Sequence, residues 1–144
     1  MFFFQHGLAD LVVGANNHGF IEMLWRDWSP GYDPSFDLEF IRKSLADPKN
    51  MRAALGYYRA TLGDGYRDPQ LNELQNKMNS AVPSQPLLYL HGKNDGCIGI
   101  DVVESAKSIA PANVRFEIVD DAGHFLQLEQ PKQVNKIICD FIVG

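Results

Sequence analysis

Apolar residues in the first 80 positions recur at the three- and four-residue spacing of amphipathic helices, and no stretch there alternates with the period of a strand. Turn-forming Pro, Gly and Asp residues divide this region into short segments. The pattern therefore predicts helices near residues 8–12, 20–28, 35–45 and 69–79. Asn17 is the predicted cap of the second of these helices. A further helix is expected to begin after a cap at Asn50 and to end at Gly63 and Gly65.

The pattern changes after the loop SAVPSQP, where short apolar runs follow one another. Leu87–Leu90 and Val114–Val119 have the length and composition of strands, and Val102–Ala110 and Gln130–Val143 have helical spacing. The order strand, helix, strand, helix predicts an α/β fold with a parallel sheet. Two parallel strands bury little area on their own, so we expect this sheet to be incomplete. The chain divides into a helical region, residues 1–80, and an α/β region, residues 81–144.

Composition and charge exclude several classes of protein. The 144 residues are 45% hydrophobic, which is too high a fraction for intrinsic disorder. The net charge is −5 and no basic cluster is present, so nucleic acid is not an expected partner. No apolar run approaches the ~18 residues of a membrane span, and we expect a cytoplasmic protein that does not bind membranes. Cys97 and Cys139 lie far apart without a Cys/His cluster, so we predict neither a disulfide nor a metal site.

The residues that follow the two predicted strands carry the candidate chemistry. Asp95 follows the first strand and His124 follows the second, so both lie at the carboxyl edge of one sheet. Loops that leave adjacent strands there can bring a carboxylate against an imidazole, leaving the second ring nitrogen to act as a base. Two structural alternatives remain open: Asp95 as a turn residue in Asn-Asp-Gly, and His124 as a buried histidine satisfied by a neighbour. Asp120 and Asp121 are interpreted as loop carboxylates.

A nucleophile to complete such a site is not recognisable. No Ser, Cys or Asp has Gly two positions away on both sides, the spacing of a nucleophile elbow. The serines, Ser29 among them, lie in predicted helices or linkers. We interpret His6, His18 and His91 as surface or loop histidines, although His91 ends its strand and could help to shape the Asp95 loop.

The strings HGKNDGCIG and DDAGHFLQLEQPKQVNKII resemble the carboxy-terminal third of the α/β-hydrolase superfamily, particularly its epoxide-hydrolase-like and dehalogenase-like branch. The resemblance implies a partial α/β-hydrolase fold in which Asp95 is the acid and His124 is the general base. It also implies that residues 1–80 form the helical cap, or lid, and that residues 81–144 form the last part of the core. The segments FIEMLWRDWSPGYD and AALGYYRATL look like cap helices.

The same resemblance implies a role for Tyr58. In epoxide hydrolases, cap tyrosines point their hydroxyls at the epoxide oxygen, and Tyr57-Tyr58-Arg59 matches one such context. A neutral phenol suits this role because it donates a hydrogen bond to a developing alkoxide. An aromatic residue at helical spacing can equally belong to a core. The partner tyrosine would precede Met1, so Met1 looks like an internal methionine of a longer protein.

The functional hypothesis is a fragment of an epoxide-hydrolase-like enzyme that acts on a small-molecule substrate without metal or organic cofactor. The chain supplies the acid and the base but lacks the nucleophile, so by itself it is expected to be inactive. Three alternatives remain: a fragment of a serine esterase or lipase-like enzyme, a dehalogenase-like enzyme, and a non-catalytic truncated module. Trp25 and Trp28 are interpreted as packing residues in preference to halide ligands. The exposed edge of the first strand could allow self-association.

Overall fold

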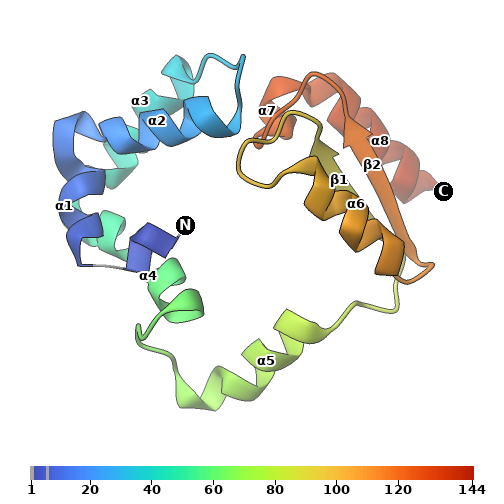
Figure 1. Ribbon diagram of the computed structural model, residues 1–144, viewed down its shortest axis with the longest axis horizontal. Helices are drawn as coiled ribbons and strands as arrows, with labels where there is room; N and C mark the ends of the chain where they lie inside the picture. The colour runs from blue at the N-terminus through green and yellow to red at the C-terminus, as the bar shows by residue number, and fades with distance from the viewer. Residues whose placement is uncertain (1, 6) are drawn as a thin grey trace. The chain divides into compact units, whose positions relative to one another are not determined.

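The computed structural model describes residues 2–5 and 7–144 and divides into two compact units. The first unit contains residues 1–23 and 34–81, and the second contains residues 24–33 and 82–144 (Figure 1). The short segment 24–33 therefore joins the α/β part of the chain, a feature that the sequence pattern did not indicate. Met1 and His6, which figured in the sequence interpretation, lie outside the described residues.

The first unit is helical, as the apolar spacing predicted. Helix α2 begins in this unit and ends in the second. The helices are α1 (Leu8–Gly14), α2 (Gly19–Trp28), α3 (Ser35–Leu45), α4 (Pro48–Leu62) and α5 (Asn72–Ser80), with 3-10 turns at Phe2–Gln5, Ala15–Asn17 and Pro69–Leu71.

Both predicted helix caps in this unit are wrong. Asp47 caps α4 because its side chain accepts a hydrogen bond from Lys49 N, and Pro48 needs no partner at the first helical position. The side chain of Asn50 instead donates to the carbonyl of Ser44. Asn17 does not cap α2: it has a φ of 54°, the left-handed region that asparagine tolerates, and α2 begins only at Gly19.

Apolar packing and two ion pairs hold the helices of the first unit together. Its buried apolar residues are Phe4, Ala9, Val13, Leu38 and Leu55. Arg59 of α4 pairs with Asp10 of α1 at 2.5 Å. Arg42 of α3 pairs with Glu22 of α2 at 2.6 Å. Each ion pair joins two different helices, so the charged side chains reinforce the same arrangement as the apolar core.

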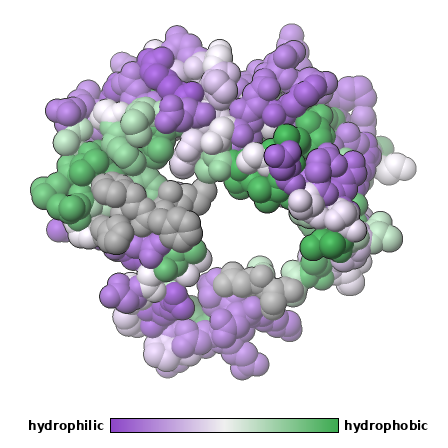
Figure 2. All heavy atoms as spheres, viewed as in Figure 1, coloured by the Kyte–Doolittle hydropathy of each residue, from purple (hydrophilic) through white to green (hydrophobic). Residues whose placement is uncertain are grey.

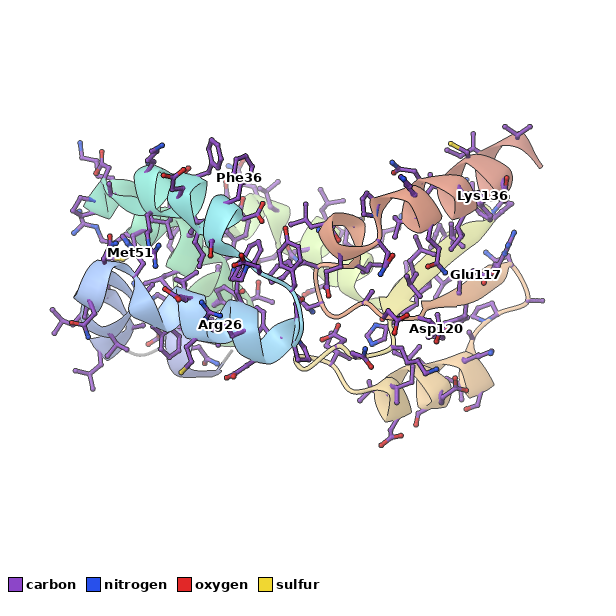
Figure 3. All side chains as sticks on the ribbon, turned by 90° about the horizontal axis from the view of Figure 1, so that it is seen from above. Arg26, Phe36, Met51, Glu117, Asp120 and Lys136 are labelled. Atoms are coloured by element: carbon purple, nitrogen blue, oxygen red, sulfur yellow. The ribbon has the colours of Figure 1, made fainter. Side chains whose placement is uncertain are left out.

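The second unit has the predicted order of strand, helix, strand and helix. Strands β1 (Leu87–Gly92) and β2 (Val114–Val119) are parallel, with Leu87 opposite Val114 and Gly92 opposite Val119. Helices α6 (Ile100–Ile109) and α8 (Pro131–Val143) cover opposite faces of the strands, and the short α7 (Leu126–Glu129) precedes α8 (Figure 3). The predicted α/β fold class is confirmed.

The two faces of this small sheet are packed unequally. Under α8, Val119, Ala122 and Val134 are almost fully buried and pack with Leu90, Leu126 and Ile137. On the α6 face, an open apolar groove of about 340 Å³ has Tyr89, Val103 and Phe116 among its lining residues. Hydrophobic residues are visible at the surface of this unit in Figure 2.

The sheet is as small as the sequence predicted. Among the described residues β1 pairs only with β2, so each strand keeps one edge without a partner in the sheet. An unpaired strand edge can pair with another chain. Self-association through this edge stays a prediction.

We predict that Val119→Ala lowers the free energy of unfolding of the second unit by about 2 kcal/mol, since it removes two buried methyl groups and leaves a cavity. Val119 is fully buried, whereas Val143 at the end of α8 is 88% exposed. Val143→Ala is the matched control and should change the stability by less than about 0.5 kcal/mol. Urea unfolding measures the free energy of unfolding of both variants. Equal losses in Val119→Ala and Val143→Ala would contradict the assignment of Val119 to the core.

Candidate functional site

Asp95 lies in the turn that follows β1, and each oxygen of its carboxylate has a different role. Oδ1 accepts hydrogen bonds from the backbone N–H groups of Cys97 at 2.7 Å and Ile98 at 2.9 Å. Oδ2 lies 2.9 Å from Nδ1 of His124. The side chain is only 5% exposed. The turn interpretation and the acid interpretation of Asp95 are therefore compatible, because one oxygen orders the turn and the other faces the imidazole.

His124 lies in the loop that follows β2, and its side chain is 26% exposed. Because β1 and β2 are adjacent and parallel, their carboxyl ends deliver Asp95 and His124 to the same edge of the sheet. A carboxylate at Nδ1 keeps the proton on that nitrogen and leaves the lone pair on Nε2. The structure thus brings together the two residues that the sequence paired, in the geometry that a base requires.

Hydrogen bonds lower the pKa of the Asp95 carboxyl. Burial by itself raises that pKa, because it disfavours the charged form. The hydrogen bonds from Ile98 N–H, the His124 ring and Cys97 N–H, with the charge of His124, outweigh burial and hold the pKa below its ordinary value. Asp95 is therefore ionised at neutral pH and can stabilise an imidazolium.

Asp120 has a different partner from Asp95. Its carboxylate pairs with Nζ of Lys93 at 2.7 Å, and both side chains are more than half exposed. Figure 3 shows Asp120 beyond the end of β2. An exposed pair of this kind contributes little to stability and leaves Asp95 as the carboxylate that meets His124.

His91 is buried, so its interpretation as a surface histidine is wrong. It is 3% exposed, and its Nε2 lies 3.0 Å from the carbonyl of Ile98. Nδ1 lies 3.4 Å from the hydroxyl of Tyr89, and Oδ2 of Asp95 lies 3.8 Å from Nε2. The ring thus braces the turn that carries Asp95. Its position on the face of β1 that also carries Tyr89 is the signal that could have indicated burial.

The segment at the end of α2 holds both site loops, and sequence reasoning missed it. The carbonyl of Trp28 accepts a hydrogen bond from Gly96 N at 3.1 Å and another from His124 N at 2.9 Å. A Cβ on Gly96 would lie 2.0 Å from the carbonyl oxygen of Asp27, and one on Gly123 would lie 2.6 Å from Cα of Ser29. Only glycine permits such close approach. These glycines, one after Asp95 and one before His124, were the available sequence signal.

Aromatic side chains surround the imidazole. The Trp28 ring meets the His124 ring edge-on, with centroids 5.0 Å apart. Trp25 stacks on Phe125 at 3.9 Å. These contacts fit the interpretation of both tryptophans as packing residues and place an apolar wall beside the His124 ring.

Tyr58 belongs to the first unit, where it lies on α4 and is half-buried. Its ring packs against Phe4 with centroids 4.7 Å apart, whereas the neighbouring Tyr57 is 79% exposed. The pair of Asp95 and His124 belongs to the second unit. The role of Tyr58 toward a substrate therefore stays a prediction.

The described residues contain no group of three or more His, Cys, Asp or Glu side chains that could hold a metal ion. Over the same part of the chain, no helix combines the length and apolar character needed to cross a membrane.

Comparison with known proteins identifies similar sequences. The family described as the alpha/beta hydrolase fold matches residues 2–131. The chain is 32% identical over 123 residues to epoxide hydrolase 3 of Xenopus tropicalis, and the match covers 74% of the chain and 33% of that protein. It is 26% identical over 129 residues to the carboxylesterase YbfK of Bacillus subtilis, covering 72% of the chain and 44% of that protein. The chain thus spans less than half the length of these relatives.

Solved structures show the same fold. A candidate epoxide hydrolase from Klebsiella pneumoniae superposes with a TM-score of 0.76 at 20% identity, over 96% of this chain and 47% of that one. The Cif epoxide hydrolase from Acinetobacter nosocomialis superposes with a TM-score of 0.71 at 20% identity, over 96% and 43%. At this level of identity the likeness establishes the fold alone.

The lowered pKa of Asp95 predicts a specific dependence of stability on pH. The ionised carboxylate stabilises the folded state fully above the ordinary pKa of 3.8, and this contribution is lost as pH falls through the lower pKa of the folded state. We expect Asp95→Asn to remove this part of the acid sensitivity, because the amide does not titrate. Urea unfolding between pH 2.5 and 7, with exposed Asp120→Asn as the control, measures it. Equal acid sensitivity of Asp95→Asn and wild type would contradict the pKa direction.

Proposed function

Because the chain belongs to the α/β-hydrolase fold family, we propose that Asp95 and His124 are the acid and the general base of a hydrolase most similar to the epoxide hydrolases. The observation that carries this proposal is the 2.9 Å contact between Nδ1 of His124 and Oδ2 of Asp95. It leaves Nε2 as the nitrogen that can accept a proton from water.

The reaction proceeds in two steps. A carboxylate supplied from outside these 144 residues attacks an epoxide carbon, the carbon–oxygen bond of the ring breaks, and an enzyme ester forms. The hydroxyl of Tyr58, as part of the cap formed by residues 1–80, donates a hydrogen bond to the developing alkoxide and then transfers its proton to it. The alkoxide becomes a hydroxyl and Tyr58 becomes a phenolate.

In the second step His124 acts. Nε2 removes a proton from water, and the hydroxide attacks the carbonyl carbon of the ester. The ester bond then breaks, and the imidazolium returns its proton to the leaving oxygen, which departs as the diol. The acid formed on the nucleophile loses its proton through solvent to the Tyr58 phenolate, so the carboxylate and the phenol are both restored. Asp95 stabilises the imidazolium that forms in between. The products are one diol and the regenerated enzyme, and no metal or organic cofactor enters the reaction.

A serine esterase is the second candidate, and the similarity to a carboxylesterase favours it. The same Asp95 and His124 would then serve a serine nucleophile, with His124 needed already in the first step. A dehalogenase-like reaction would also form an enzyme ester, with halide as the leaving group. A non-catalytic module would form no covalent intermediate with any of these substrates.

The variant His124→Gln separates these candidates in the polypeptide encoded by the complete reading frame that contains these residues. We expect diol formation to fall by about 10³-fold, because ester hydrolysis loses its base. The ester should accumulate and raise the protein mass by the mass of one epoxide. Intact-protein mass spectrometry detects it, and His18→Asn, outside the site, is the control. If His124→Gln instead abolishes the cleavage of an ester substrate and no adduct forms on the protein, the result favours the serine esterase. The isolated 144-residue chain should show no turnover.

Tyr58→Phe tests the proposed contact with the epoxide oxygen in the same polypeptide. Removal of the phenolic donor should lower kcat/KM for epoxides by about 10²-fold, since the alkoxide loses a hydrogen bond as it forms. The matched control is Tyr57→Phe, because Tyr57 is 79% exposed. Steady-state kinetics measures kcat/KM for both variants. Equal values of kcat/KM in Tyr58→Phe and Tyr57→Phe would mean that Tyr58 only packs against Phe4.

A further inference from the structure

A buried hydroxyl and a carboxylate that the proposed reaction does not use lie beside the base. Ser29 directly follows the last residue of α2 and is completely buried. Its Oγ donates to Oε1 of Glu129 at 2.8 Å and accepts from the backbone N–H of Phe125 at 3.1 Å. Oε2 of Glu129 accepts from the backbone N–H of Gly123 at 2.9 Å. We call Ser29 and Glu129 the brace.

The brace and the Trp28 carbonyl bind three successive N–H groups. Gly123 N–H is held by Glu129, His124 N–H by Trp28, and Phe125 N–H by Ser29. The peptide planes on both sides of the His124 Cα are therefore tied to groups outside the loop. Rotation of either plane would break one of these hydrogen bonds and leave a polar group unpaired, which disfavours the rotation.

Position matters here because the contact between the imidazole and Asp95 is a single hydrogen bond of 2.9 Å. A displacement of about 1 Å at a reacting group can lower a rate about 10²-fold. The loop between β2 and the four-residue α7 contains no regular element that would hold it. The brace supplies that support through a serine and a glutamate separated by 100 positions.

We infer that Ser29 and Glu129 are positioning residues that hold the His124 loop in register with Asp95. This inference rests on the proposed function in taking His124 as the base. The competing explanation is that the brace only fastens α2 to α7. In that case its loss lowers stability but leaves the contact between His124 and Asp95 intact.

The experiment uses the 144-residue chain and needs no turnover. Proton and nitrogen NMR follows exchange with water of the His124 Nδ1–H and of the amides of residues 123–125, and thermal unfolding measures stability separately. Ser29→Ala and Glu129→Ala are compared with Ser108→Ala and Glu104→Ala, matched substitutions at exposed positions of α6. Glu129→Gln keeps the volume and one acceptor oxygen, so it gives a result if Ser29→Ala does not fold.

We expect Nδ1–H exchange to accelerate by about tenfold or more in Ser29→Ala and Glu129→Ala, with a smaller change in Glu129→Gln and none in the controls. The double variant should add little, because both residues act through one network. An Nδ1–H signal that exchanges as slowly in the brace variants as in wild type, despite lower stability, would overturn the inference. The inference would also be overturned if the wild-type chain showed no His124 Nδ1–H signal, or no protection of the His124 backbone amide from exchange.

Failure of the proposed function gives a different result. If His124 is not a catalytic base, turnover of the complete polypeptide survives His124→Gln while the NMR signal still depends on the brace. If only the brace inference fails, His124→Gln abolishes diol formation, and Glu129→Ala keeps kcat and KM unchanged. If both hold, Glu129→Ala lowers kcat by about tenfold with little change in KM.

Discussion

The parallel pairing of β1 with β2 is the constraint on which the site depends. Two parallel neighbours end at the same edge of a sheet, so the chain after Gly92 and the chain after Val119 emerge side by side. Asp95 and His124, 29 positions apart in sequence, consequently meet at 2.9 Å. An antiparallel pair would have placed these loops at opposite ends, and no choice of side chains could then have joined Asp95 to His124.

The pair is further held by backbone that comes from a distant part of the chain. The residues at the end of α2 lie close to both loops because Gly96 and Gly123 have no Cβ to exclude them. The single carbonyl of Trp28 binds one N–H from each loop. His91 at the end of β1 adds a second support to the Asp95 turn, because its buried Nε2 contacts the carbonyl of Ile98 in that turn. Asp95 and His124 are thus supported by different neighbours, and the end of α2 contacts both of their loops.

Similarity to epoxide hydrolases and to a carboxylesterase is consistent with the chemistry of the pair. An aspartate that orients a histidine serves either an ester intermediate on a carboxylate or an acyl intermediate on a serine, because both are resolved by water that the histidine activates. What distinguishes these enzymes is the nucleophile and the groups that face the leaving oxygen. Among the described residues, Tyr58 is the candidate for a group that faces the leaving oxygen. It lies on α4 in the first unit.

Local sequence determined most of the elements of this protein and singled out Asp95 and His124 as the candidate site residues. Apolar spacing indicated most of the helices and both strands, and the turn residues around Asp95 and His124 marked the ends of those strands. Local pattern did not predict that Asp47 caps α4 or that α2 begins only at Gly19, because several nearby polar residues are each compatible with a cap.

Tertiary structure alone decided the burial of Ser29 and the contact of Ser29 with Glu129. Periodicity reports which face of an element is apolar, and a polar residue in a linker carries no such signal. The partner of a buried polar group is chosen by how the chain folds back on itself, which brings together positions that no local pattern connects.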